Sequence, residues 1–187
     1  LLWCVSRSAM VTTMGPIGIS RMNKVLNLLG VSHSNEPDPE TGLTRKEKHL
    51  VERSWNLVKT NLKANGMELF LLLFKECPEA QNYFPFRDIP LDELPNNGKF
   101  KAHAVTVMYS IGSIVDNLNE NDVLIGLLQK NAESHSKRGI PEEAYWTLKK
   151  CMMQLLKNKL GPDFSKEVEE AWDKTLTVAF TVIIKNF

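Results

Sequence analysis

The chain has 187 residues, of which 43% are hydrophobic and 24% are charged, a composition typical of a globular protein. Its 23 basic and 22 acidic residues leave a net charge of +1 and form no long basic stripe, which argues against nucleic acid as the main partner. The richest apolar run, residues 175–184, has ten residues. Because a membrane span needs roughly 18–20, no transmembrane segment is expected.

The three cysteines, Cys4, Cys77 and Cys151, include no close pair, which excludes a CxxC redox or zinc motif. Reduced thiols in a cytoplasmic protein are the expected state, because disulfides are rare in that compartment. A bridge between Cys77 and Cys151 stays open at this point.

The first 42 residues differ from the rest of the chain. Up to His33 they carry three basic residues and no acidic one, and residues 34–42 then contain two prolines and a glycine, which disfavour regular structure. The sequence therefore predicts a flexible N-terminal extension and linker over residues 1–42 and one folded domain over residues 43–187. A transit peptide is an alternative interpretation of the acid-poor start. Other candidate starts of the protein are Met10, Met14 and Met22.

From residue 43 onward, apolar residues recur at helical spacing, and no segment alternates apolar and polar residues over the length of a strand. Thr44, followed three residues later by Glu47, forms a capping box and marks the start of the first helix. The pair Asn65-Gly66 is expected to break or bend the chain. The pattern as a whole predicts an all-α domain with six to eight helices.

Later helix boundaries are marked by proline, glycine and capping residues. Pro78 is expected to open a short helix, and residues 84–90, with two prolines, to form a rigid corner. Asp122 is the expected N-cap of the helix that leads to His135. Residues 138–141 and 161–163 are expected to separate the last helices.

Two histidines lie on the apolar faces of separate predicted helices. His103 shares a face with apolar residues at spacings of four, four, three and four, and His135 ends a similar stripe. A single histidine of this kind is usually a hydrogen-bonded core residue. One on each of two core-facing helices indicates a ligand that needs a nitrogen donor on each side. The stripes consist of Val107, Ile111, Ile114 and Leu118 for the first helix, and Leu124, Leu127, Leu128 and Asn131 for the second.

The identity of that ligand follows by elimination. Structural zinc requires four ligands, usually with one close pair, and the chain has neither an HxxxH nor a CxxC pattern. A non-haem iron site needs carboxylates on core-facing positions, and no repeated Glu-x-x-His motif is present. A cofactor that brings its own equatorial donors remains, and that cofactor is haem, iron protoporphyrin.

At this point the sequence resembles the globin family over about residues 43–187. The resemblance implies a globin fold with its helices packed around a haem pocket, and a haem protein that binds dioxygen and other diatomic ligands. It rests on the order and spacing of Trp55, Pro78-Glu79, the corner at Phe84, His103 with Val107, Ser134-His135 and Ile140-Pro141.

The resemblance also implies roles for individual residues. His135 would be the proximal ligand of the haem iron, with Ser134 touching its imidazole and a propionate. His103 would donate a hydrogen bond to bound dioxygen, or would coordinate the iron itself as a sixth ligand. Phe84 would stack on the porphyrin. Further predicted cofactor contacts are Phe70 and Val107 on the ligand side, Ile140, and the propionate candidates Arg87, Lys101 and Arg138.

Two departures from the family pattern stand out. One residue is missing between His135 and Ile140, which makes the position of Arg138 hard to assign. Asn131 replaces an expected leucine one turn before His135, where it either loosens the packing or offers a hydrogen bond.

Three functions are compatible with these residues. The first is reversible dioxygen binding for storage, transport or buffering, without catalysis as the main role. The second is a six-coordinate globin with redox or signalling chemistry on nitric oxide, nitrite or peroxide, which would include nitric oxide dioxygenase or nitrite reductase as secondary activities. The third is a helical interaction module with inert histidines. The sequence does not predict the oligomeric state.

Overall fold

The computed structural model describes residues 36–187, and in this part of the chain all regular structure is helical, as predicted. Its six α-helices fall within the predicted range. The expectations for the transit peptide, the alternative starts and Cys4 lie outside the described residues. The helices are α2 (Arg45–Val58), α3 (Leu62–Glu76), α4 (Gly98–Asp116), α5 (Asn121–Ser136), α6 (Glu142–Leu160) and α7 (Lys166–Lys185), and the 3-10 turns are η1 (Lys59–Asn61), η2 (Pro78–Tyr83), η3 (Leu94–Asn96) and η4 (Gly161–Asp163).

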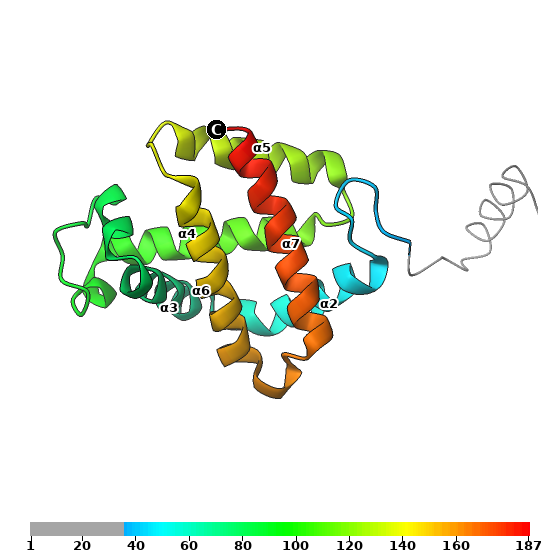
Figure 1. The fold of residues 1–187 in the computed structure, drawn as a ribbon. Helices are drawn as coiled ribbons and strands as arrows, with labels where there is room; N and C mark the ends of the chain where they lie inside the picture. Colours follow the sequence, from blue (N-terminus) through cyan, green and yellow to red (C-terminus); the bar gives the residue numbers. More distant parts are fainter. Residues whose placement is uncertain (1–35) are drawn as a thin grey trace, which may run out of the picture. The chain divides into compact units, whose positions relative to one another are not determined.

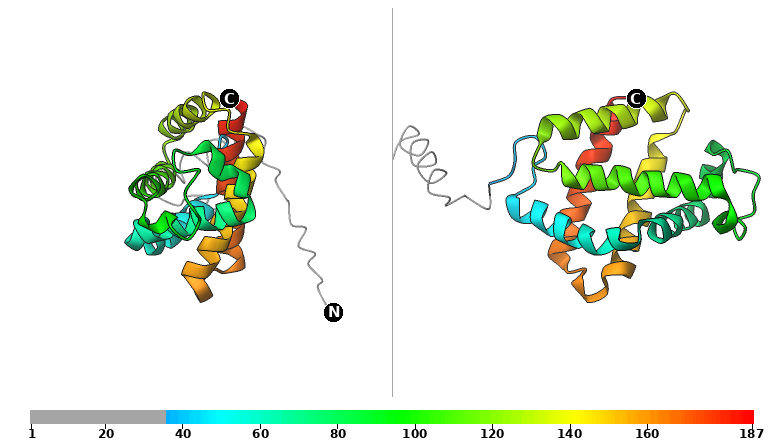
Figure 2. Two further views of the ribbon diagram at one scale, coloured as in Figure 1. Left: turned by 90° about the vertical axis from the view of Figure 1, so that its left-hand side faces the viewer. Right: turned by 180° about the vertical axis from the view of Figure 1, so that it is seen from behind.

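The helices form two crossed layers (Figures 1 and 2). α6 and α7 are joined by η4 and run in opposite directions across one side, and the view from behind shows α2, α4 and α5 crossing them. α7 packs against α2, α5 and α6, whereas α3 packs mainly against α4 and α6. None of the helices in residues 36–187 is long and apolar enough to cross a membrane.

Side-chain caps begin three of these helices. At α2 the predicted capping box is confirmed, because the Glu47 N–H donates to Thr44 Oγ1 at 3.1 Å and Glu47 Oε2 accepts from the Thr44 N–H at 2.6 Å. At α4 the Asn97 side chain accepts from the Phe100 N–H, and at α7 the Ser165 side chain accepts from the Val168 N–H. The prediction for Asp122 is wrong: α5 begins at Asn121 without a side-chain cap, and Asp122 lies in its first turn. There its charge still suits the positive end of the helix dipole.

The predicted break at Asn65-Gly66 is also wrong, because both residues lie inside α3 and are buried. The chain bends earlier, at η1, and the Asn65 side chain closes that bend by donating to the Val58 carbonyl oxygen at 2.7 Å. Gly66 is needed for packing instead. A Cβ at this position would lie 2.6 Å from the carbonyl oxygen of Ala104 on α4, so the missing side chain permits α3 and α4 to approach closely.

The corner that follows η2 is held by one side chain, which agrees with the rigid corner predicted there. Gln81 Nε2 lies 3.1 Å from the carbonyl oxygen of Phe86, 3.2 Å from that of Arg87 and 2.8 Å from that of Ile89. Phe84, at the start of the corner, is thereby fixed relative to the end of α3.

The segment just before α2 is attached to the helices by Asp38. Its carboxylate lies 2.9 Å from Lys48 Nζ on α2 and 3.2 Å from Asn121 Nδ2 at the start of α5. The Lys48 side chain is only 8% exposed. The predicted division of the chain at residue 42 stays a prediction, with residues 38–41 contacting the helical domain.

We expect Gly66→Ala to destabilise the protein by about 1–3 kcal/mol, because the added methyl group overpacks the contact between α3 and α4. Gly126→Ala on α5 is the matched control. No atom lies within 4 Å of a Cβ at Gly126, so this change should stabilise the helix by about 0.5–1 kcal/mol. Urea unfolding of both variants measures the difference. Equal stability of Gly66→Ala and the parent chain would contradict the close approach.

Asp38 predicts a pH-dependent contribution to stability. Burial raises the pKa of Asp38, but hydrogen bonds from the Thr41 N–H, Lys48, Asn121 and the Glu40 N–H outweigh it and hold this pKa well below its usual range. The carboxylate therefore stabilises the fold above the unfolded-state pKa of about 3.9, and this contribution is lost as the pH falls through the folded-state pKa.

We expect Asp38→Asn to lower the free energy of unfolding by about 2–4 kcal/mol at pH 7, because it leaves the buried Lys48 ammonium without its partner. The difference in unfolding free energy between the variant and the parent chain should become smaller below pH ~4. Glu167→Gln is the control, since its pair with Lys46 is exposed and should contribute less than about 1 kcal/mol. A difference in unfolding free energy that is the same at pH 7 and at pH ~2 would refute this role of Asp38.

Candidate functional site

A cavity of about 620 Å³ is lined by residues of α4 and α5, with α3, η2 and α6 completing its walls. Its size falls within the range of roughly 300–1,000 Å³ that is typical of cofactor and ligand pockets. Seven of the ten predicted cofactor contacts line it together. These seven are Phe70, Phe84, His103, Ser134, His135, Arg138 and Ile140.

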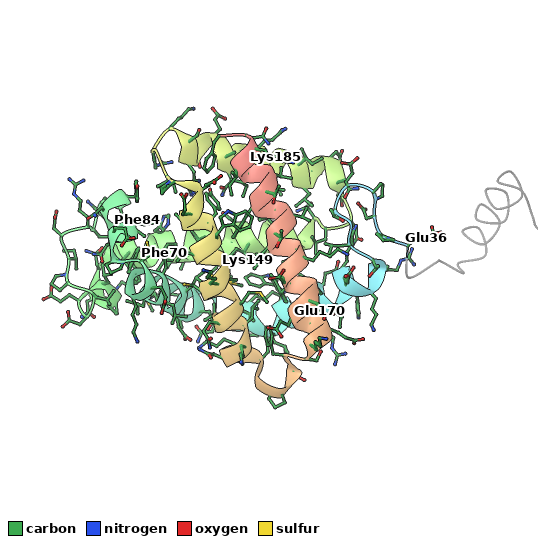
Figure 3. The ribbon with its side chains drawn as sticks, in the orientation of Figure 1. Glu36, Phe70, Phe84, Lys149, Glu170 and Lys185 are labelled. Carbon is green, nitrogen blue, oxygen red and sulfur yellow. The ribbon has the colours of Figure 1, made fainter. Side chains whose placement is uncertain are left out.

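His103 projects from α4 into an aromatic environment. Its ring centroid lies 5.0 Å from that of Phe70 and 4.9 Å from that of Phe84, both in edge-on geometry. Phe70 of α3 and Phe84, which follows η2, lie close together (Figure 3), with their ring centroids 5.8 Å apart. Burial, together with the charges of His135 and Arg138, lowers the pKa of His103 to about 4. The imidazole is therefore neutral at physiological pH.

His135 lies near the end of α5 and is oriented through its Nδ1 atom. Nδ1 is 2.9 Å from the carbonyl oxygen of Asn131 and 3.0 Å from Ser134 Oγ, so the expected contact between Ser134 and the imidazole is confirmed. Burial lowers the pKa of His135, opposed by the bond to Asn131 and reinforced by the charge of Arg138. A neutral ring that donates from Nδ1 leaves the lone pair of Nε2 free for a metal.

Three of the ten predicted contacts are not among the residues that line the cavity. Val107 is half-buried and packs against the hydrophobic core. Arg87 has a 63% exposed side chain next to Asp88, at 3.8 Å, and Lys101 is half-buried on α4. Arg138 lines the cavity, and its guanidinium donates to the carbonyl oxygen of Ser134. The roles of these residues toward the cofactor stay predictions.

The cavity-lining edge of α4 differs from the apolar stripe that the sequence indicated. His103 and Ile114 of α4 line the cavity. The other residues of α4 that line it carry hydroxyl groups, namely Thr106, Ser110 and Ser113. Each hydroxyl donates to the carbonyl four residues earlier in its own helix. The spacings of three, four and three residues from His103 are visible in the sequence. They mark a polar stripe, whereas the prediction of the cavity wall rested on apolar residues.

A second feature that sequence reasoning missed is a polar pair beside His135. Tyr145 of α6 donates from its hydroxyl to Asn131 Oδ1 at 2.7 Å. Its ring lies edge-on to the His135 imidazole, with centroids 5.7 Å apart. Asn131 therefore offers the hydrogen bond that its unusual position suggested.

The residues of this site fit haem. Among residues 36–187 no group of three or more His, Cys, Asp or Glu side chains is placed to hold a metal ion. A metal bound in this cavity must therefore bring most of its own donors and take only imidazole nitrogens from the protein. The cavity offers that donor set, one neutral imidazole from α4 and one from α5, among aromatic and aliphatic side chains.

Comparison with known proteins agrees with the fold. The family model described as Globin matches residues 67–183. A globin of Nerita albicilla is 29% identical over 142 residues, which cover 75% of this chain and 90% of the relative. An anaerobic nitrite reductase of Arabidopsis thaliana is 32% identical over 140 residues, covering 72% of this chain and 87% of that protein. A hexacoordinated heme protein from an anhydrobiotic tardigrade has a TM-score of 0.76 at 25% identity, covering 80% of this chain and 98% of that one.

The chain therefore belongs to the globin family, and haem is its cofactor. Globins bind diatomic ligands at the haem. Family membership argues against the alternative of a helical interaction module with inert histidines.

We expect removal of the haem to lower both the helix content and the melting temperature. A closed, empty cavity of 620 Å³ would cost about 15 kcal/mol at roughly 24 cal/mol per Å³. This upper bound equals or exceeds a typical total stability of about 5–15 kcal/mol, so the cavity must collapse or fill with water. Circular dichroism melts before and after acid–ketone extraction measure the change. An unchanged melting temperature would contradict the prediction.

Proposed function

We propose that this globin binds dioxygen reversibly, for storage, transport or buffering, at a haem iron held by His135. His103 would donate a hydrogen bond to the bound dioxygen. The observation that carries the proposal is the pair of neutral imidazoles from α4 and α5 facing one cavity. No general acid, base or nucleophile beyond these residues is needed for binding alone.

On the proximal side, the chain supplies an oriented and electron-rich ligand. Nδ1 of His135 donates to the Asn131 carbonyl, which fixes the tautomer and directs the Nε2 lone pair into the cavity. His135 would hold the haem through Nε2, and the bound cofactor would supply a ferrous iron able to bind a diatomic ligand.

On the distal side, the chain supplies one hydrogen-bond donor in an apolar surrounding. His103 is neutral, so it carries one ring N–H that donates to a partly negative diatomic ligand. Phe70 and Phe84 contact its ring edge-on and restrict water near it. Exclusion of water and protons slows oxidation of the iron, which favours reversible binding.

The charged edge of the haem requires a cationic partner. We propose Arg138 for this role ahead of Arg87 and Lys101, because Arg138 lines the cavity and the other two do not. Ser134, which also lines the cavity, is the proposed second partner of a propionate.

The second candidate function is a six-coordinate globin with redox or signalling chemistry. Two comparisons favour it: one similar structure is a hexacoordinated heme protein, and one relative is named anaerobic nitrite reductase. In this form His103 would occupy the sixth position of the iron, and a diatomic ligand would have to displace it. Nitric oxide dioxygenase or nitrite reductase activity would then be a secondary enzymatic role.

The cytoplasm is the proposed location for either function. The two cysteines of the described residues, Cys77 and Cys151, are free thiols, as expected for a reducing compartment. Burial raises the pKa of Cys151 to about 11, with the Glu76 and Cys77 charges contributing, so this thiol is unreactive in the folded protein.

The absorption spectrum of the ferrous, ligand-free protein separates the two functions. Sharp, split visible bands indicate that His103 binds the iron, and one broad band indicates an open site. Dioxygen storage predicts the broad band and a stable oxygenated form. Split bands together with rapid oxidation in air would reject storage in favour of the redox alternative.

We expect His103→Leu to weaken dioxygen binding about ten- to a hundredfold if the site is open, because a hydrogen bond to a charged group contributes about 1.5–3 kcal/mol. His49→Leu is the matched control, since His49 lies exposed on α2 and does not line the cavity. Flash photolysis and stopped-flow dissociation rates measure the change. In the six-coordinate case the same variant binds dioxygen faster, and an effect equal to that of His49→Leu would exclude His103 from both roles.

A further inference from the structure

The side-chain hydrogen bond between Tyr145 and Asn131 has no part in the function derived so far. Tyr145, in the first turn of α6, is 5% exposed, and its hydroxyl donates to Asn131 Oδ1 on α5 at 2.7 Å. Asn131 is half-buried. The bond therefore joins a buried residue of α6 to a residue of α5 that lines the cavity.

Both members of the pair contact His135 directly. The Tyr145 ring lies edge-on to the imidazole with an interplanar angle of 60°. The backbone carbonyl of Asn131 accepts from Nδ1 of the same imidazole at 2.9 Å. Tyr145, Asn131 and the His135 imidazole therefore all contact one another. Tyr145 lies on α6, and the other two residues lie on α5.

The pair also joins two helices that have little other contact. α5 packs mainly against α7, with a smaller contact to α4. Among the hydrogen bonds of residues 36–187, the one from Tyr145 to Asn131 is the one that links α5 to α6. Loss of this bond would remove the hydrogen bond between α5 and α6 and loosen the packing of Tyr145 and Asn131 beside the imidazole.

An apolar pair would fill the same space without polar atoms to satisfy. A buried neutral hydrogen bond contributes only about 0.5–1.5 kcal/mol net, so packing alone gives no reason for a tyrosine and an asparagine here. A hydrogen bond has a direction, however, and fixes the relative placement of the groups that it joins. Such a constraint matters most where the angle of a metal ligand must be held.

We propose that Tyr145 and Asn131 are positioning residues for His135, which keep its imidazole in one plane and its Nδ1–H directed at the Asn131 carbonyl. The proposal rests on the proposed role of His135 as the iron ligand. A well-aligned bond at Nδ1 makes Nε2 a stronger electron donor, which favours the ferric over the ferrous iron. Loosening the pair should weaken the iron–imidazole bond and favour the ferrous form.

The test uses Tyr145→Phe, Asn131→Leu and the double variant, all in a His103→Leu background that keeps the sixth position of the iron free. Tyr145→Phe removes a single oxygen atom and preserves the ring packing. We expect the iron–imidazole stretching band in the Raman spectrum of the ferrous protein to broaden and move to lower frequency. At a fixed potential, the ferrous-to-ferric ratio should rise about threefold to tenfold, up to about 59 mV for one electron.

The double variant separates positioning from simple packing. Because the two side chains act through one hydrogen bond, adding Tyr145→Phe to Asn131→Leu should cause no further shift in the band or the potential. Tyr109→Phe, at a 62% exposed position of α4, is the control and should change neither. A lower melting temperature with an unchanged band and potential would mean that the pair is only structural, and would overturn the proposal.

The same measurement distinguishes this inference from the proposed function. The iron–imidazole band must be lost in His135→Ala. If it persists there, the ligand assignment fails. If it is lost in His135→Ala but is unaffected by Tyr145→Phe and Asn131→Leu, the ligand assignment stands and the positioning role is rejected.

Discussion

The hydrogen bond from Nδ1 of His135 to the Asn131 carbonyl is the interaction on which the proposed function of this globin depends. A buried imidazole is available to a metal only when it is neutral and when its proton is held on the nitrogen that faces away from the metal. Burial supplies the first condition and the Asn131 carbonyl the second. The helix itself provides that acceptor, since residues four apart lie on one face. Ligand orientation is thus built into the register of α5.

The opposite wall depends on close helix packing rather than on hydrogen bonds. α3 carries Phe70, α4 carries His103, and the two helices are brought together at Gly66, where a methyl group would meet the Ala104 carbonyl. The corner after η2 then presents Phe84 to the same imidazole. His103 is therefore surrounded by aromatic edges, and its low pKa follows from this burial. Hydrogen bonds therefore position the His135 side of the cavity, and close packing of helices and aromatic rings positions the His103 side.

Features that depend on short stretches of sequence were predictable, and features that depend on contacts between distant residues were not. The capping box at Thr44 and the two histidine-bearing helices follow from local spacing, so the all-α fold and the haem cofactor were predictable, while the roles of the individual site residues stay predictions. Gly66 was misread as a break, because its purpose is visible only with Ala104 beside it. The bond between Tyr145 and Asn131 joins two helices, and no periodicity within either helix indicates it. Charged surface residues such as Arg87 were the least predictable, because several orientations of a solvated side chain have similar energies.

The most direct test of the central claim is a His135→Gly variant studied with and without added imidazole. If the side chain at position 135 holds the iron, the purified variant should contain little haem. Free imidazole, which fits the space left by the ring, should restore haem binding and the absorption spectrum of the parent protein. Full haem occupancy with an unchanged ferrous spectrum in the absence of imidazole would contradict the assignment.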